Sequence, residues 1–233
     1  MRKITFTNVG NAEIHSEYYP KPSKSFLPDW YKNHGSYISD KPKDIIQGKI
    51  TATVKKCMPV FDVLSAGYMI VTHHDIHIAQ NEEGIFFSTP DNVTNINWHT
   101  PQQIKNHPMA MNVDGIPKFE SPWSIETPKG YSCLFINPTH QRNPYFAIYQ
   151  WFVDTDNWSV PVNFPFILTD PNFEGIVPAG TPLAQVIPVR RDAWKINYGS
   201  QGEKEKVNKT YTHYKTVFYE GYKNFFWSKK KFD

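Results

Sequence analysis

The sequence predicts a mainly β fold with one helix near the C-terminus, in a single domain of 233 residues. The first observation is composition: aromatic residues make up 15% of the chain, prolines number 19, and charged residues reach only 20%. This mixture suits short strands joined by proline-rich turns better than a helical bundle. The second is a series of short segments in which apolar and polar residues alternate between turn signals. The third is one late segment with apolar residues at helical spacing.

Strand candidates occupy most of the region 48–194, which is expected to form the β core. Residues 1–47 read as an N-terminal arm packed through Phe26, Trp30 and Tyr31. Residues 91–118 are polar and irregular and are expected to form an insertion in the core. The predicted strand segments are 48–56, 68–78, 83–90, 123–138 (two strands around a turn at Pro128–Gly130), 145–153, 161–168 and 182–189.

The last region, 195–233, is expected to hold the helix and a basic tail. Within 204–226, Val207, Tyr211, Tyr214 and Phe218 recur at helical spacing, so one helix is predicted there despite Gly221. The run Lys229–Lys231 near the end reads as a solvated tail.

Charge and cysteine content narrow the partners and the compartment. The net charge is +3, and the basic residues of the whole chain form no stripe interleaved with aromatics, so nucleic-acid binding is not expected. Cys57 and Cys133 form no CxxC pair and are expected to be buried thiols in a reducing compartment. No segment has the length and apolarity of a signal peptide or a membrane span, which predicts a cytoplasmic protein with no membrane partner.

Four segments, in this order, resemble the motifs of the dUTPase and dCTP-deaminase superfamily. The fourth, "IVPAGTPLAQVI", is the most specific, because it is similar to the Ile-x-x-Gly-Asp-x-Ile-Ala-Gln-Leu hairpin of that family. The resemblance covers roughly residues 63–190. The four segments are Ala66-Gly67-Tyr68 followed by Asp75-Ile76, then Thr127 to Tyr131, then Val153 to Trp158, and lastly Ile176 to Ile187.

The resemblance implies a β-clip, or distorted jelly-roll, domain that assembles as a homotrimer with nucleotide sites between subunits. Asp154 stands where the family has an acid that can orient or deprotonate a water as a general base. A nucleotide or small anion is the implied ligand. The residues implied to contact it are Tyr68, His140, Arg142, Asp156, Trp158 and Gln185.

Several positions depart from the family pattern. Met69 replaces the metal-linked aspartate and cannot ligate Mg²⁺, so no cofactor is firmly implied. The phosphate-gripping Arg-Ser-Gly is replaced by residues near 139–142, where His140 and Arg142 could still face an anion. Trp158 replaces the tyrosine under the base, and no glycine-rich C-terminal lid is present. The expected function is therefore nucleotide binding with altered or lost hydrolase or deaminase activity.

Two further functions are compatible with the sequence. The segment around Gly180 also resembles the ending of an uncharacterised family of tailed-phage proteins, which implies a phage-encoded protein in the host cytoplasm. A non-catalytic viral structural or interaction protein on the same trimeric scaffold is therefore the first alternative. An iron(II)/2-oxoglutarate oxygenase is the second, with His73, Asp75 and His140 as a facial triad and Arg142 for the co-substrate.

Each of these candidate residues also has a structural interpretation. In a continuous strand His73, Asp75 and His77 would share one solvent-facing polar side, and this interpretation is favoured over a metal site. Asp154 and Asp156 are more typical of Asx turns than of catalysis. The aromatic residues Trp151, Phe152 and Trp158 favour a core or subunit interface over a base-stacking platform.

Overall fold

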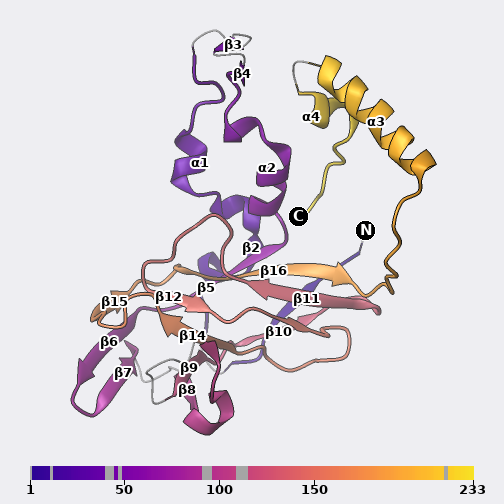
Figure 1. The fold of residues 1–233 in the computed structure, drawn as a ribbon. Coiled ribbons are helices and arrows are strands. Elements are labelled where there is room, and N and C mark those ends of the chain that lie inside the picture. Colours follow the sequence, from indigo (N-terminus) through magenta and orange to yellow (C-terminus); the bar gives the residue numbers. More distant parts are fainter. Residues whose placement is uncertain are drawn as a thin grey trace. The chain divides into compact units, whose positions relative to one another are not determined.

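The structure is a computed structural model, and it describes residues 2–10, 13–39, 45–46, 49–90, 96–108, 115–217 and 220–233 (Figure 1). Its contacts divide the chain into two compact units. We call Met1–Phe26 with Gly67–Arg191 the β unit, and Leu27–Ala66 with Asp192–Asp233 the helical unit. The single domain expected from the sequence stays a prediction, since two clusters of contacts can belong to one folding unit.

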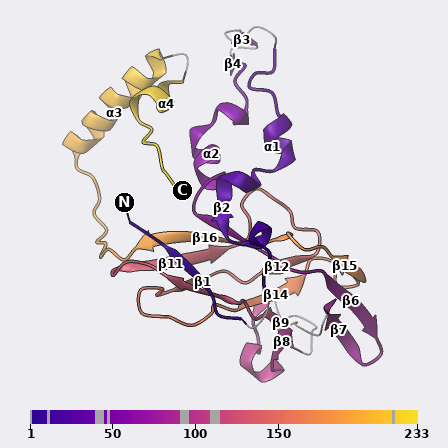
Figure 2. The same cartoon turned by 180° about the vertical axis from the view of Figure 1, so that it is seen from behind.

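The β unit is built from antiparallel sheets, so the prediction of a mainly β protein is confirmed (Figure 2). One sheet has five strands in the order β13-β11-β16-β5-β2. A second has four, in the order β12-β14-β9-β8, and a third has three, in the order β15-β6-β7. Strand β1 pairs with β10. The strands of this unit are β1 (Thr5–Asn8), β2 (Lys21–Pro22), β5 (Tyr68–Val71), β6 (Ile76–Asn81), β7 (Gly84–Ser88), β8 (Ile96–His99), β9 (Ile116–Phe119), β10 (Trp123–Glu126), β11 (Tyr131–Ile136), β12 (Phe146–Ile148), β13 (Trp151–Val153), β14 (Phe164–Leu168), β15 (Gly175–Val177) and β16 (Pro182–Arg190).

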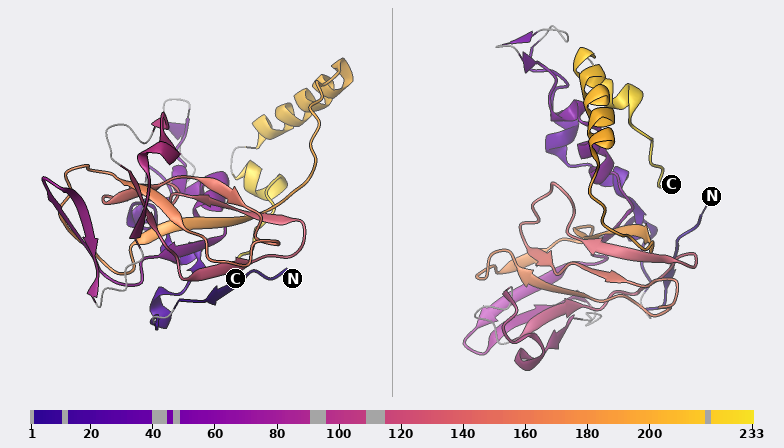
Figure 3. Two further views of the ribbon diagram at one scale, coloured as in Figure 1. Left: turned by 90° about the horizontal axis from the view of Figure 1, so that it is seen from below. Right: turned by 45° about the vertical axis from the view of Figure 1, so that its right-hand side comes forward.

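The core of the β unit lies between the five-stranded and four-stranded sheets, which face each other in Figures 1 and 3. Alternation along β11 and β14 points Phe135, Phe164 and Phe166 inward, and none of the three is exposed to solvent. The ring of Phe135 lies 5.8 Å from that of Phe164, and Phe166 stacks on Phe119 of β9 at 4.0 Å. Packed aromatic rings of this size dominate the burial of apolar surface.

Gly67, at the entrance to β5, shows why the first resembling segment carries a glycine. Its φ of +67° lies in the left-handed region, and a Cβ there would stand 1.9 Å from the carbonyl oxygen of Val186. The backbones of this turn and of β16 can therefore approach each other only at a residue without a side chain.

The helical unit combines two segments that are far apart in the sequence. The first holds α1 (Asp29–Asn33), β3 (Ile45–Ile46), β4 (Lys49–Ile50), the 3₁₀ turn Val54–Lys56 and α2 (Met58–Leu64). The second holds α3 (Gln201–Thr216) and α4 (Gly221–Phe225). Polar contacts join the segments: the indole Nε1 of Trp227 donates to both carboxylate oxygens of Asp62, at 3.0 and 2.9 Å, and Lys56 pairs with Glu220 at 2.5 Å.

Several element predictions were wrong in detail. The segment 68–78 is two strands, β5 and β6, in different sheets, and 145–153 is likewise β12 and β13. In 48–56 the described part is the short β4 and a 3₁₀ turn instead of one strand. The predicted irregular insertion contains β8, which pairs with β9, while its residues 91–95 and 109–114 lie outside the described part. The predicted C-terminal helix is confirmed as α3, although it ends at Thr216, the short α4 follows it, and Phe218 lies outside the described residues.

The predicted arm and core also divide differently. Within residues 1–47, β1 and β2 pair with strands of the β unit, whereas α1 belongs to the helical unit. Long-range pairing decides this division, and alternation within a single segment carries no information about its partner strand.

Candidate functional site

A shallow groove of about 600 Å³ runs along the edge strand β13 and the turn that follows it. The turn is closed by the backbone N–H groups of Asn157 and Trp158, which both donate to the carbonyl oxygen of Asp154 at 2.9 Å. It presents Asp154 and Trp158 on the same surface as the exposed side chain of Phe152. The residues that line this groove, here called the Asp154 groove, are Trp151, Phe152, Val153, Asp154, Asn157, Trp158, Pro161, Val162 and Asn163.

Asp154 is fixed in position while most of its side chain stays in solvent. Its Oδ1 accepts a hydrogen bond from the hydroxyl of Ser132 at 2.6 Å and lies 3.3 Å from a guanidinium nitrogen of Arg191. The side chain is nevertheless 62% exposed. Since both contacts fall on Oδ1, the other carboxylate oxygen keeps its full capacity to accept hydrogen bonds.

Asp156, two residues later, is buried and has both of its carboxylate oxygens engaged within the protein. Its side chain is only 2% exposed, and the guanidinium of Arg191 grips both of its oxygens, at 2.8 and 2.5 Å. The backbone N–H of Gly130 donates to it at 2.7 Å. These hydrogen bonds, from Arg191 first and Gly130 second, hold the pKa of Asp156 at about 2. Asp156 thus ties the 154–158 turn to the 128–130 turn and to the end of β16.

Below this ion pair lies a small buried polar cluster. The hydroxyls of Thr127 and Thr155 are 2.7 Å apart, and that of Thr155 contacts the sulfur of Cys133 at 3.4 Å. Burial raises the pKa of the Cys133 thiol to about 11, so the thiol stays protonated and unreactive at neutral pH. The expectation of a buried thiol is confirmed for Cys133 and wrong for Cys57, which is exposed.

A second group of predicted residues gathers in the loop after β11. Gln185 is completely buried on β16, and its side-chain oxygen accepts a hydrogen bond from the backbone N–H of Thr139 at 3.0 Å. His140 adopts a left-handed backbone with φ of 52°, and both His140 and Arg142 are exposed. Gln185 therefore supports this loop from below, and the loop presents an imidazole and a guanidinium to the surface.

The two groups lie at opposite ends of β11. The Asp154 groove adjoins Ser132 at its start, whereas the His140 loop follows Ile136 at its end. Ser132 and Ile136 are four positions apart along the strand, which corresponds to about 13 Å, so the two groups do not form one site within this chain. Tyr68 belongs to neither group: it pairs with Val186 on β16, and its ring packs against Phe6 at 5.5 Å. Asp154, Asp156 and Trp158 come together, and His140, Arg142 and Gln185 come together elsewhere.

The residues of the oxygenase alternative lie apart from both groups. His73 and Asp75 occupy the bend between β5 and β6, so they do not share one strand face as predicted. Asp75 accepts a hydrogen bond from the backbone N–H of Ala179 at 2.8 Å. Desolvation by burial, reinforced by the neighbouring His74, lowers the pKa of His73 to about 4. Among the described residues, no three His, Cys, Asp or Glu side chains are placed to hold a metal ion, and the oxygenase stays an untested prediction.

Arg191 and Ser132 are the functional neighbours that the sequence did not reveal. Arg191 follows the strand predicted to end at 189, and it meets Asp156 across 35 residues of sequence. The position of Arg191 directly after an apolar strand could have indicated this contact, because such an arginine can reach acidic residues in the turns at that end of the sheet.

Comparison with protein-family models, curated protein sequences and solved structures found no match for this chain. Within the described residues, no helix is both long enough and apolar enough to cross a membrane.

Proposed function

We propose that the β unit is a divergent nucleotide-binding scaffold of the dUTPase-like, β-clip type, in which the Asp154 groove takes the nucleobase. The observation that carries the proposal is an oriented carboxylate in an aromatic groove: Asp154 is held by Ser132 and Arg191 beside the exposed Trp158. A flat indole offers a surface on which a planar heterocycle can stack. A distorted jelly-roll topology and a phage origin are part of this proposal.

The polar groups of the groove favour a particular class of base. A carboxylate can only accept hydrogen bonds, so Asp154 suits a base that presents an amino group or a ring N–H. The amides of Asn157 and Asn163 also line the groove and can both donate and accept. Uracil flanks the N–H of its pairing edge with two carbonyl oxygens that repel a carboxylate, so bases with an exocyclic amine, such as guanine and cytosine, are expected to bind more tightly than uracil.

Altered or lost catalysis agrees with the surroundings of Asp154. One of its oxygens is already engaged by Ser132 and Arg191, which leaves a single oxygen for a ligand or a water. Met69, which stands at the family's metal-linked position, is 1% exposed and lies in the core of the β unit. A Mg²⁺-dependent hydrolysis in the family's manner is thus not part of the proposal.

A homotrimer would bring the separated groups together. Within one chain the His140 loop and the Asp154 groove lie at opposite ends of β11. In an assembly of copies, His140 and Arg142 of one subunit can meet the phosphates of a nucleotide whose base lies in the groove of the next. This arrangement is the one implied by the dUTPase resemblance.

Two exposed apolar residues of the three-stranded sheet are candidates for the contact between subunits. Ile176 on β15 lies opposite His77 on β6, and Phe86 on β7 lies opposite Ala79, so these side chains share one face of the three-stranded sheet. Ile176 and Phe86 are both exposed on this face. His77 and Ser88 share this face with them, so it is mixed in character, and the two exposed apolar side chains are the candidates for a subunit contact. The variant Ile176→Ser is expected to shift the sedimentation coefficient toward that of a monomer.

A nucleotide titration tests the proposed function directly. Nucleosides and nucleotides carrying each base are added up to millimolar concentration, and the melting temperature and binding heat are recorded, because a ligand that binds only the folded state stabilises it. Trp158→Ala and Asp154→Asn should remove the shift. Trp98→Ala is the matched control, since Trp98 is also exposed and lies outside the groove. The absence of a shift with every nucleotide would refute the proposal.

A further inference from the structure

The two units carry opposite net charges. The helical unit contains fifteen lysines, no arginine and nine acidic residues, which gives it a net charge of +6. The β unit holds ten basic and thirteen acidic residues, a net charge of −3. The whole-chain value of +3, from which nucleic-acid binding was not expected, is the sum of these two charges and conceals the positive unit.

Three acidic side chains of the helical unit are engaged inside it. Asp62 accepts hydrogen bonds from Trp227 and pairs with Lys230 at 2.7 Å. Glu220 pairs with Lys56 and lies 3.5 Å from Lys223. Glu203 caps the start of α3 by accepting from the backbone N–H of Ser200 at 2.6 Å. Asp62 and Glu220 are therefore committed to lysines outside α3, while Glu203 keeps its negative charge at the start of that helix.

The lysines of α3 remain available to an anion. Lys204, Lys206, Lys209 and Lys215 are all exposed, and within the described part of the chain none of them forms an ion pair. Lys215 lies over the ring of Tyr211, with its Nζ 4.4 Å from the ring centre. The helix buries none of its own residues, although His213 and Tyr214 contact the rings of Phe225 and Phe226.

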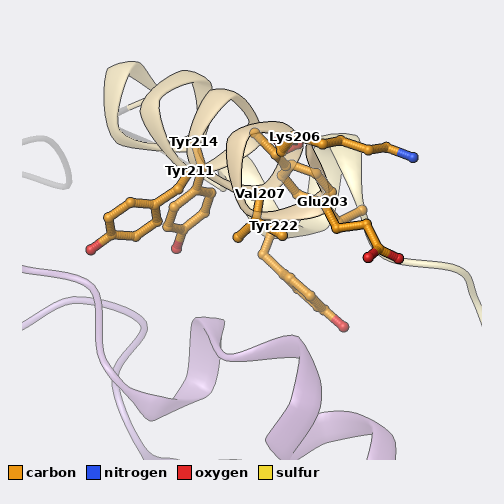
Figure 4. A pocket seen from close by; sticks show the side chains of 8 residues that line it. Glu203, Lys206, Val207, Tyr211, Tyr214 and Tyr222 are labelled. Carbon is orange, nitrogen blue, oxygen red and sulfur yellow. Dashed lines mark hydrogen bonds between the residues drawn. The ribbon is translucent and has the colours of Figure 1, made fainter. Parts of the chain in front are cut away.

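Aromatic rings line a groove of about 650 Å³ beside these lysines (Figure 4). Val207, Tyr211 and Tyr214 follow one another at helical spacing and project from one side of α3, while Tyr222 comes from α4 (Figure 4). Tyr211 remains 55% exposed. The residues that line the groove are Glu203, Lys206, Val207, Thr210, Tyr211, Tyr214, Tyr222 and Phe226.

Exposed aromatic side chains continue into the segment before α3. Trp194 is 89% exposed and Tyr198 is 83% exposed, and Lys195 lies next to Trp194 in the sequence. Lysines also adjoin the aromatic residues of the groove, as Lys215 follows Tyr214 and Lys223 follows Tyr222. These lysines neighbour the aromatic residues in sequence, and the contact of Lys215 with the ring of Tyr211 brings charge and stacking surface together in space.

We propose that the helical unit binds single-stranded nucleic acid. Bases stack on Tyr211, Tyr214 and Tyr222, and the lysines of α3 contact the phosphates. An unpaired strand is required, because the faces of paired bases are covered by their neighbours. Lysine is a point charge that contacts phosphate without reading base edges, so binding is expected to depend little on sequence.

The composition of the groove favours this ligand over a membrane surface. An interfacial helix buries a broad aliphatic and aromatic face among lipid chains. Val207 is the single aliphatic residue lining the groove, and three of its other members are tyrosines whose hydroxyl groups need a polar partner. The proposal is independent of the nucleobase site on the β unit, since no residue is shared between the two grooves.

Fluorescence anisotropy of the full chain with a labelled oligothymidylate tests the proposal. An oligonucleotide of about 20 residues exceeds the span of a single stacking site. Tyr211→Ala is expected to weaken binding roughly ten-fold, the loss of one stacked base, and Tyr222→Ala by a similar factor. Trp98→Ala, which removes an exposed aromatic residue of the β unit outside both grooves, is the matched control and should bind like the unaltered chain. Circular dichroism of each variant verifies that α3 is retained.

Salt and charge variants add a second readout. Affinity should fall with salt concentration, and Lys206→Glu should reduce the slope of log K against log salt by about 0.7 for each phosphate that the protein no longer neutralises. Lys129→Glu, at an exposed position of the β unit, is the control and should leave the slope unchanged.

Three results would overturn the proposal: no binding at low salt, equal weakening by Trp98→Ala and Tyr211→Ala, or binding of phosphatidylserine vesicles without binding of the oligonucleotide. The proposed nucleobase site is tested by a different measurement, the effect of mononucleotides on the melting temperature of the unaltered chain and of Trp158→Ala. Either proposal can therefore fail while the other stands.

Discussion

The β unit and the helical unit are stabilised in different ways. The β unit encloses aromatic side chains such as Phe135 and Phe166 with no exposed surface, whereas α3 of the helical unit buries no residue at all. The helical unit instead holds its two chain segments together through polar contacts at Asp62 and Glu220. Apolar burial gives the β unit a specific packed core, while the helical unit leaves aromatic and lysine side chains at its surface. Buried apolar side chains favour the stability of a fold, and exposed aromatic and lysine side chains favour the binding of a ligand.

The largest effect is expected from removing a core ring. Phe166→Ala should lower the free energy of unfolding of the β unit by about 3–5 kcal/mol, because Phe166 stacks on Phe119 and leaves a cavity when truncated. Phe225→Ala is the matched control in the helical unit, where Phe225 is exposed and the change should be small. Urea denaturation followed by fluorescence measures both. Equal losses in the two variants would contradict the contrast between the units.

Gly67→Ala should cost the β unit about 3 kcal/mol, since the added Cβ would meet the backbone of Val186 and the residue keeps a positive φ. Gly84→Ala isolates the second cause, because Gly84 has φ of +128° and nothing within 4 Å of an added Cβ. Its loss should be visibly smaller in the same denaturation experiment. Equal losses in the two variants would show that the close approach of Gly67 to the backbone of β16 does not contribute to the cost.

Asp62→Asn should destabilise the helical unit by about 1–2 kcal/mol, because it weakens charge-assisted hydrogen bonds from Trp227 and Lys230. Hydrogen exchange should quicken in α2 and near Trp227, while amides of the β-unit strands keep their protection. Asp29→Asn is a suitable control, since Asp29 forms only an exposed pair with Lys32. A uniform loss of protection over both units would show that they unfold together.

Acid sensitivity should arise from Asp156. Its pKa is about 2 in the folded chain against an ordinary value of 3.8, so the folded state holds the proton less tightly than the unfolded state. The stability that Asp156 contributes is complete above pH 4 and is lost as the pH falls through about 2. Melting temperatures measured between pH 5 and 2 should therefore fall less steeply for Asp156→Asn. If the melting temperatures of the two proteins fall equally with pH, Asp156 is not the source of the acid sensitivity.

The smallest perturbation is thiol labelling, which distinguishes the units without a mutation. Cys57 of the helical unit is exposed and should react with a thiol reagent in the folded protein at neutral pH. Cys133 of the β unit should react only after unfolding, because it is buried and its pKa is about 11. Two fast-reacting thiols per chain would contradict the burial of Cys133.

The candidate site was only partly predictable. Asp154 and Trp158 were singled out from the sequence, and the structure places both in one groove. Their neighbours Ser132 and Arg191 were missed, since the contact of Arg191 with Asp156 joins residues 35 positions apart. His140 and Arg142 were expected to contact the same ligand as Asp154, and within one chain β11 separates them, because the length of the strand sets that distance.

The sequence by itself determined the elements whose pattern is local: β10 and β11 around Gly130, β14, β16, and the C-terminal helix, predicted within 204–226 and observed as α3. Alternation and turn residues are sufficient for these because each depends on neighbours within a few positions. Only the tertiary structure decided that 68–78 breaks between two sheets and that 27–66 joins 192–233 in a lysine-rich unit. Strand pairing and ion pairs between distant segments produce both results, and neither leaves a periodic signal in the chain.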